Sequence, residues 1–192
     1  IAVVEDEAEV QAVLQIARTH GRPVTFRAAG TSLSGQAITD GVLVLIGEGF
    51  ATCEIAEGAT TVRLGPGIIG GEVNDRLAPL GRKIGPDPAS INACKIGGIA
   101  ANNASGMCCG TAQNSYRTVA GMRVVLADGT VLDTEDPGSV ATDFAYYGLD
   151  TCAGCGLCST ACPVGIDTGE LTRRLRGRGL GSASRQVGQW TV

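Results

Sequence analysis

The strongest guide to the fold is the segment Val24-Thr25-Phe26-Arg27-Ala28-Ala29-Gly30-Thr31-Ser32-Leu33-Ser34-Gly35-Gln36, in which a predicted strand runs into a loop of small residues. Such a loop can turn several backbone N–H groups, with the hydroxyls of Thr31, Ser32 and Ser34, toward one anion. The patterns G-x-x-x-x-G-K-S/T and G-x-G-x-x-G are absent here, which argues against nucleotide hydrolysis and a Rossmann dinucleotide site. Taken alone, the loop is better explained as a surface turn.

An amphipathic helix is predicted upstream of this strand. Asp6 and Glu9 have the spacing of a capping box, and the helix that they open extends through His20 and is closed by Gly21. Four apolar residues at helical spacing form its buried stripe: Val10, Val13, Leu14 and Ala17. The single histidine of the chain is therefore assigned to a helix end.

The remaining segments alternate between strands and helices. Strands are predicted over residues 1–4, 42–46, 52–56, 60–64, 122–127 and 130–133, and a second helix over residues 69–80. The pair Asp128-Gly129 predicts a hairpin turn between the last two strands. This order indicates a mixed α and β domain.

Composition and charge exclude several classes of function. The chain has 192 residues, 44% of them hydrophobic, which is enough to bury a core. Its formal net charge of −4 offers no field for nucleic acid, and no apolar stretch approaches the roughly 18 to 20 residues of a membrane span. It opens inside an apolar run without a signal peptide, as an internal start does, and its cysteine usage favours a reducing compartment. We therefore predict a cytoplasmic chain that binds no nucleic acid, with peripheral contact at the inner face of the membrane left open.

A dense cysteine run follows: Cys152-Ala153-Gly154-Cys155-Gly156-Leu157-Cys158-Ser159-Thr160-Ala161-Cys162-Pro163. The spacing C-x2-C-x2-C-x3-C-P suits a 4Fe-4S cluster, because tight turns aim the sulfurs at one cluster and small residues let backbone N–H groups approach it. A zinc site more often has separated Cys pairs or Cys with His, and a disulfide framework fits less well still. The predicted cluster ligands are Cys152, Cys155, Cys158 and Cys162.

The fourth ligand of this cluster stays open at the level of sequence. In two-cluster ferredoxins the fourth Cys of such a run binds the other cluster, and no second run occurs here. Either Cys162 closes the one cluster, or a missing segment or partner supplies the last thiolate, or the site is incomplete. The other four cysteines, Cys53, Cys94, Cys108 and Cys109, are interpreted as small buried hydrophobic residues.

A second block of small residues accompanies the first loop: Gly85-Pro86-Asp87-Pro88, followed by Ile96-Gly97-Gly98-Ile99-Ala100-Ala101-Asn102-Asn103-Ala104-Ser105-Gly106. Together the two loops resemble the FAD-binding domain of the vanillyl-alcohol oxidase and p-cresol methylhydroxylase family. The resemblance is greatest to the branch that oxidises D-2-hydroxy acids, the FAD-linked D-lactate dehydrogenases and glycolate oxidases, some of which carry a C-terminal ferredoxin-type region. It covers about residues 1–140 and, separately, residues 143–180.

The resemblance implies which residues bind FAD. Some relatives attach FAD covalently through a histidine, but the single histidine here, His20, is assigned to a helix end, so we expect noncovalent binding. The first loop would hold the pyrophosphate, and the second would line the opposite wall, where glycine lets the backbone approach the cofactor. The implied residues are Ala28, Ala29, Gly30, Thr31, Ser32, Ser34, Gly35, Gln36, Pro86, Asp87, Ser90, Gly97, Gly98, Ala101, Asn102, Ser105 and Gly106.

The implied architecture is an α+β fold: a two-subdomain FAD-binding domain of the p-cresol methylhydroxylase type, followed by a small ferredoxin-like iron-sulfur segment. We expect the FAD-binding domain over residues 1–140, incomplete at its N-terminus, the 4Fe-4S segment over residues 141–180 and a flexible tail over residues 181–192. The substrate domain of the resembled enzymes is missing, as though skipped near residues 141–143.

The resemblance also implies an activity. A hydride from C2 of a D-2-hydroxy acid would reduce FAD, and electrons would leave singly through the cluster to an acceptor of quinone or cytochrome type. No catalytic base or carboxylate-binding arginine is identifiable, so we expect no turnover from this fragment alone. The alternatives are a noncatalytic flavin and iron-sulfur electron-transfer subunit, and a truncated gene product without function.

Overall fold

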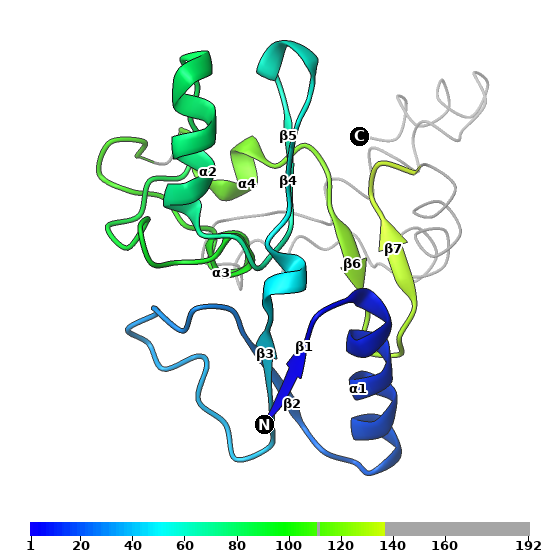
Figure 1. Ribbon diagram of the computed structural model, residues 1–192. Coiled ribbons are helices and arrows are strands. Elements are labelled where there is room, and N and C mark those ends of the chain that lie inside the picture. The colour runs from blue at the N-terminus through cyan, green and yellow to red at the C-terminus, as the bar shows by residue number, and fades with distance from the viewer. Residues whose placement is uncertain (111, 137–192) are drawn as a thin grey trace, which may run out of the picture. The chain divides into compact units, whose positions relative to one another are not determined.

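The computed structural model describes residues 1–110 and 112–136, and the chain divides after Leu132. The predicted segments 141–180 and 181–192, with the four predicted cluster ligands, lie outside the described residues. Within the first unit, Ile1–Leu132, the elements form two lobes, one above the other in Figure 1. The first lobe contains the three strands and the helix of the N-terminal segment, and the second lobe contains the elements over residues 48–118.

The first lobe is built on a parallel sheet. Its strands β1 (Ala2–Val4), β2 (Val24–Arg27) and β3 (Val42–Ile46) lie in the order β1-β3-β2. Because side chains alternate along a strand, Val4 and Val44 face helix α1 (Glu7–Thr19), where they form a buried cluster with Val10 and Leu14. These three strands and this helix confirm the elements predicted from the sequence.

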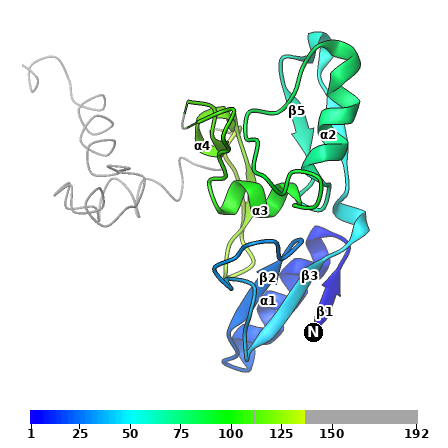
Figure 2. The same cartoon turned by 90° about the vertical axis from the view of Figure 1, so that its left-hand side faces the viewer.

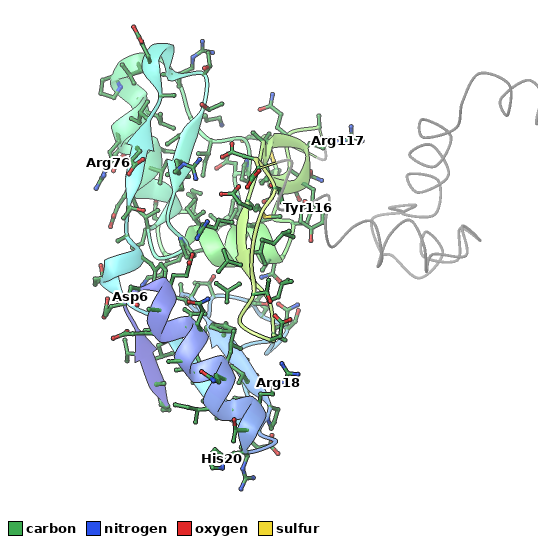
Figure 3. The ribbon with its side chains drawn as sticks, turned by 90° about the vertical axis from the view of Figure 1, so that its right-hand side faces the viewer. Asp6, Arg18, His20, Arg76, Tyr116 and Arg117 are labelled. Carbon is green, nitrogen blue, oxygen red and sulfur yellow. The ribbon has the colours of Figure 1, made fainter. Side chains whose placement is uncertain are left out.

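Helix α1 begins at the predicted cap and ends at Thr19, one residue before the predicted end. The Asp6 carboxylate accepts a hydrogen bond from the Glu9 N–H at 2.9 Å, and His20 caps the other end, followed by Gly21 at φ 59° (Figure 3). The capping box differs in one contact. The Glu9 carboxylate accepts from the Glu5 N–H at 2.7 Å, one residue before the cap, and so satisfies the backbone donor where the chain leaves β1.

The second lobe combines an antiparallel ribbon with short helices: η1 (Glu48–Phe50), β4 (Cys53–Ile55), η2 (Glu57–Ala59), β5 (Val62–Leu64), α2 (Gly70–Leu77), η3 (Ala78–Leu80), α3 (Ile96–Ala101) and α4 (Ser115–Thr118). Ile68, Val73 and Leu77 form its core. The helix predicted over residues 69–80 is shorter, because Pro79 lacks the N–H that would continue it and the chain tightens into η3. In the described part of the chain no helix is long and apolar enough to cross a bilayer.

A hairpin returns the chain to the first lobe. Its strands are β6 (Arg123–Val125) and β7 (Val131–Asp133), joined at the predicted turn, where Gly129 has φ 89°. Arg123 Nε donates to Glu7 Oε2 at 2.7 Å, and Gln11 Nε2 donates to the Gly129 carbonyl at 2.7 Å. The Arg123 guanidinium, mainly through this hydrogen bond, lowers the pKa of the Glu7 carboxyl. The hairpin is thereby attached to α1.

Candidate functional site

The two loops of small residues form opposite walls of one cavity of about 580 Å³. The first wall follows β2, and the second begins before α3, which lies at the junction of the lobes in Figures 1 and 2. Eleven of the predicted FAD-binding residues line the cavity: Ala28, Ala29, Gly30, Thr31, Ser32, Gln36, Ser90, Gly97, Gly98, Ala101 and Asn102. The fold therefore brings together two segments that are far apart in the sequence.

The first wall has its shape because β2 ends where the loop begins. Gly30 has φ 70°, in the left-handed region that glycine adopts without strain. A Cβ at this position would collide with the guanidinium of Arg27, which folds back over the loop. Ser32 Oγ donates to Gln36 Oε1 at 2.8 Å and so closes the loop on itself. These contacts hold a small-residue surface open toward the cavity.

Two adjacent glycines shape the second wall in different ways. Gly97 N–H donates to the Pro66 carbonyl at 3.0 Å, and a Cβ on Gly97 would lie 2.9 Å from Cβ of Pro66, so this position must lack a side chain for α3 to lie close to Pro66. A Cβ on Gly98 would have Ala28 Cβ, on the opposite wall, as its nearest neighbour outside the local helix at 3.9 Å. Gly97 therefore serves packing, while Gly98 keeps the cavity open.

Six predicted residues do not line the cavity: Ser34, Gly35, Pro86, Asp87, Ser105 and Gly106. Four of them lie outside the lining, where two backbone segments pack against each other. Asp87 N–H donates to the Ser105 carbonyl at 3.0 Å, Pro86 is buried, and Gly106 has φ 158° with its α-carbon facing the Asp87 carbonyl so closely that a Cβ would collide with it. The packing of these two backbone segments thus explains the glycine at position 106.

The charged residues that line the cavity are basic. Among the described residues that line it, the charged ones are Arg27 and Lys95, both cationic, and none is a carboxylate. No carboxylate of the described residues pairs with Arg27, whereas Lys95 Nζ donates to the Ile46 carbonyl at 3.1 Å. Sequence reasoning missed both cations as site residues. Arg27 stands directly before the first loop and Lys95 directly before the second, and this repeated placement is the signal that could have identified them.

The four described cysteines differ in exposure. Cys94 is buried and lines the cavity, and Cys53 is half-buried and packs against the core of the second lobe, in line with their interpretation as small hydrophobic residues. That interpretation is wrong for Cys108, which is exposed. Cys109 is half-buried, with its Sγ 3.3 Å from the Gly110 carbonyl. The reason is that Cys108 lies in a turn over residues 107–110, which leaves its side chain at the surface.

Comparison with known families gives two matches within this chain. Residues 1–135 match the model of the FAD binding domain, and residues 145–167 match the model of the 4Fe-4S binding domain.

Three curated relatives are named for hydroxy-acid chemistry. Glycolate oxidase subunit GlcD of Escherichia coli (strain K12) is 32% identical over 143 residues, which is 73% of this chain and 28% of GlcD. D-lactate dehydrogenase of Archaeoglobus fulgidus is 32% identical over 129 residues, 65% of this chain and 28% of that enzyme. D-2-hydroxyglutarate dehydrogenase of Escherichia coli (strain K12) is 31% identical over 112 residues, 58% of this chain and 11% of that enzyme. The chain thus spans less than a third of the length of these relatives.

Solved structures share the fold. 6-Hydroxy-D-nicotine oxidase of Arthrobacter nicotinovorans superposes with a TM-score of 0.61 at 21% identity, over 68% of this chain and 29% of the oxidase. Chitooligosaccharide oxidase superposes with a TM-score of 0.60 at 23% identity, over 73% of this chain and 29% of the oxidase. With these neighbours, the α+β fold predicted from the two loops is confirmed.

Proposed function

The chain belongs to the FAD-binding domain family and carries a 4Fe-4S binding domain, and from this premise we propose that it is the cofactor-carrying part of an enzyme that oxidises a D-2-hydroxy acid. The observation that carries the proposal is the cavity between the two loops, whose lining suits a dinucleotide. Bound FAD would supply the two-electron acceptor for the hydroxy acid, and the cluster would supply a one-electron outlet.

The residues of the cavity fit the parts of FAD. Backbone N–H groups and the hydroxyl of Thr31 can donate to a pyrophosphate, and the guanidinium of Arg27, with which no described carboxylate pairs, can neutralise its charge. Phe26, Pro66 and other apolar residues of the lining can cover planar rings and exclude water. Gly98 leaves open the space that a Cβ would take between the two walls.

The substrate class is inferred from what three relatives have in common. Glycolate, D-lactate and D-2-hydroxyglutarate, named in those relatives, are all 2-hydroxy acids. None of the described residues that line the cavity is a histidine or a carboxylate that could act as a general base, and His20 caps α1 instead. We therefore propose that these 192 residues bind both cofactors but turn over no hydroxy acid alone.

The absence of a general base among the described lining residues favours a second candidate, a flavin and iron-sulfur subunit that transfers electrons without binding the substrate. Both candidates require an electron acceptor, for which we propose a quinone or a cytochrome. For either candidate we propose a cytoplasmic location, since thiolate ligands for a cluster persist in a reducing compartment.

The experiment is anaerobic reconstitution of the purified chain with FAD, iron and sulfide, followed by visible spectroscopy and assays of dye reduction with glycolate and D-lactate. We expect flavin peaks on the broad absorption of the cluster, and no dye reduction. A cluster spectrum without retained flavin would refute the assignment of the cavity, and flavin alone would refute the cluster. Dye reduction by the chain would contradict the claim that it lacks turnover and would remove the electron-transfer candidate.

A further inference from the structure

We propose that Lys95 is a positioning residue, which holds the two walls of the cavity at the spacing that FAD requires. The contact responsible is the hydrogen bond from Lys95 Nζ to the backbone carbonyl of Ile46, at 3.1 Å. The inference rests on the proposed binding of FAD in this cavity. It assigns to this lysine a role in fixing the cavity, while contact with the phosphates belongs to Arg27.

The two walls are stabilised by separate cores. The first wall follows β2 in the chain. It is supported by the core cluster between the sheet and α1, which includes Val44 of β3 and Leu14 of α1. The second wall is supported by the cluster of Ile68, Val73 and Leu77. The two cores share no buried residue. Phe50 of η1 packs against the core of the first lobe but does not line the cavity, so this apolar contact is not part of either wall.

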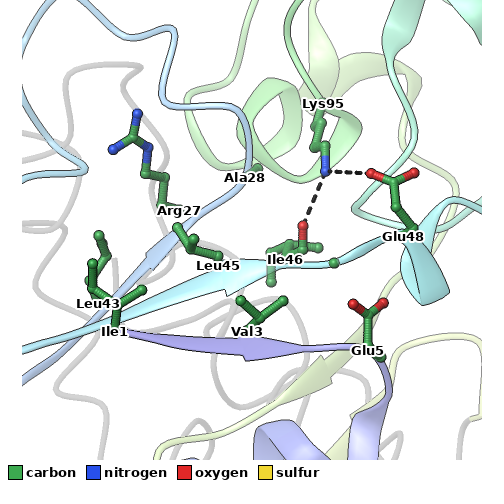
Figure 4. A pocket seen from close by; sticks show the side chains of 11 residues that line it. Ile1, Val3, Glu5, Arg27, Ala28, Leu43, Leu45, Ile46, Glu48 and Lys95 are labelled. Carbon is green, nitrogen blue, oxygen red and sulfur yellow. Dashed lines mark hydrogen bonds and ion pairs between the residues drawn. The ribbon is translucent and has the colours of Figure 1, made fainter.

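Lys95 joins these two structures at the cavity. Its backbone forms a bridge with Ile69 and caps the N-terminal end of α3, so it is fixed to the second lobe. Its side chain crosses to Ile46, the last residue of β3 in the first lobe (Figure 4). Lys95 and Ile46 are 49 positions apart in the sequence, and both line the FAD cavity.

The burial of the Lys95 side chain increases the importance of this hydrogen bond. The side chain of Lys95 is 16% exposed, so its bond to a carbonyl is poorly replaced by water. Its second partner is the Glu48 carboxylate at 3.6 Å, but that side chain is 88% exposed (Figure 4). Because exposed ion pairs contribute little, the carbonyl and not the carboxylate is the important partner.

The affinity for a ligand that must contact both walls depends on how far the walls can move relative to each other. If the link is lost, the walls must be ordered when FAD binds, and the affinity falls by the free energy of that ordering. A charge-assisted hydrogen bond of this kind corresponds to roughly a ten- to hundredfold change in an equilibrium constant. We expect most of this change to be observed as weaker binding of FAD.

The chain offers a matched control, because it contains two lysines, Lys83 and Lys95. Lys83 Nζ lies 3.7 Å from the Asp87 carboxylate, its side chain is 56% exposed, and it does not line the FAD cavity. Lys83→Met and Lys95→Met therefore make the same chemical change inside and outside the proposed link. Lys95→Arg keeps a cationic donor, and Glu48→Gln removes only the exposed ion pair.

The test measures the Kd for FAD of the full chain and its variants by calorimetry, with the Tm of the FAD-free protein and the visible circular dichroism of the bound flavin. We expect Lys95→Met to raise the Kd at least about tenfold and to change the flavin signal even at saturation. Lys95→Arg should recover most of the affinity, and Lys83→Met and Glu48→Gln should stay within about twofold of the wild type.

Equal Kd values for Lys95→Met and Lys83→Met would overturn the inference, as would a loss in Glu48→Gln as large as in Lys95→Met. A lower Tm with unchanged Kd and flavin signal would reduce Lys95 to a stabilising residue and also refute it. Should Lys95→Met fail to fold, Lys95→Gln decides by the same criteria. Failure of the wild type to bind FAD would instead refute the proposed function itself, before any variant is compared.

Discussion

Replacing Gly98 with alanine should stabilise the protein and weaken its binding of FAD. The added Cβ would have Ala28 Cβ as its nearest neighbour outside the local helix, at 3.9 Å, which is an ordinary van der Waals distance. Alanine is favoured over glycine within a helix by up to about 1 kcal/mol, so the FAD-free chain should gain about 3 to 5 °C in Tm. The same methyl group lies between the two walls, where the cofactor must fit. We expect a Kd for FAD about tenfold higher, which is about 1.4 kcal/mol.

The neighbouring position provides the control. In Gly97→Ala the added Cβ would lie 2.9 Å from Cβ of Pro66 and 3.2 Å from its carbonyl oxygen, so α3 or residues 65–67 must move. Overpacking of this kind destabilises a protein by about 1 to 3 kcal/mol. Thermal unfolding of the FAD-free chains, followed by circular dichroism, and FAD titration of both variants provide the comparison. A Tm of Gly98→Ala below that of the wild type, or an unchanged Kd, would refute the assignment of Gly98 to the cavity.

Three further predictions follow from particular side chains. Arg27→Met should raise the Kd for FAD by about tenfold or more and make it less dependent on salt, measured by titration at several ionic strengths; an unchanged salt dependence would place the phosphates elsewhere. Glu7→Gln should be less stable than the wild type in urea above about pH 5. The difference in the free energy of unfolding should disappear as the pH falls from 4.5, the ordinary pKa of the Glu7 carboxyl, through the lower pKa of that group in the folded state. Because the pair is partly exposed, the difference should be at most about 1 kcal/mol. Cys162→Ala should abolish the stable 4Fe-4S absorption after reconstitution, and retention of the full spectrum with stoichiometric iron would show that another thiolate closes the cluster.

The parts of the fold that sequence predicts are those with local physical causes. Asp6 caps α1 through an atom three residues away, and Gly129 allows the hairpin turn by its own backbone angles. The helix predicted over residues 69–80 failed at its end, where Pro79 outweighs a continuing apolar pattern. The domain limits at residues 140 and 180 and the four cluster ligands remain predictions, since they fall outside the described residues.

The sequence predicts the two loops of the candidate site, but it does not show which of their residues line the cavity and which serve packing. A glycine in a sequence can indicate that another group closely approaches the backbone there, but it does not identify that group. At Gly98 the open space is the cavity, at Gly97 the neighbour is Pro66, and at Gly106 it is the Asp87 carbonyl. Sequence reasoning gave all three the same role, because the opposing atoms belong to segments that only the fold brings together.

The two cations of the cavity show why composition alone could not describe its chemistry. Arg27 and Lys95 carry the same charge and each precedes a loop of small residues, yet only the Lys95 ammonium is bound by a backbone carbonyl. The Lys95 ammonium already has a carbonyl partner, whereas the Arg27 guanidinium, with which no carboxylate of the described residues pairs, would gain most from binding an anion. The contribution of Lys95 to FAD binding depends on geometry, and that of Arg27 depends on charge. Salt should therefore weaken the contribution of Arg27, while mutation of Lys95 should weaken FAD binding at every ionic strength.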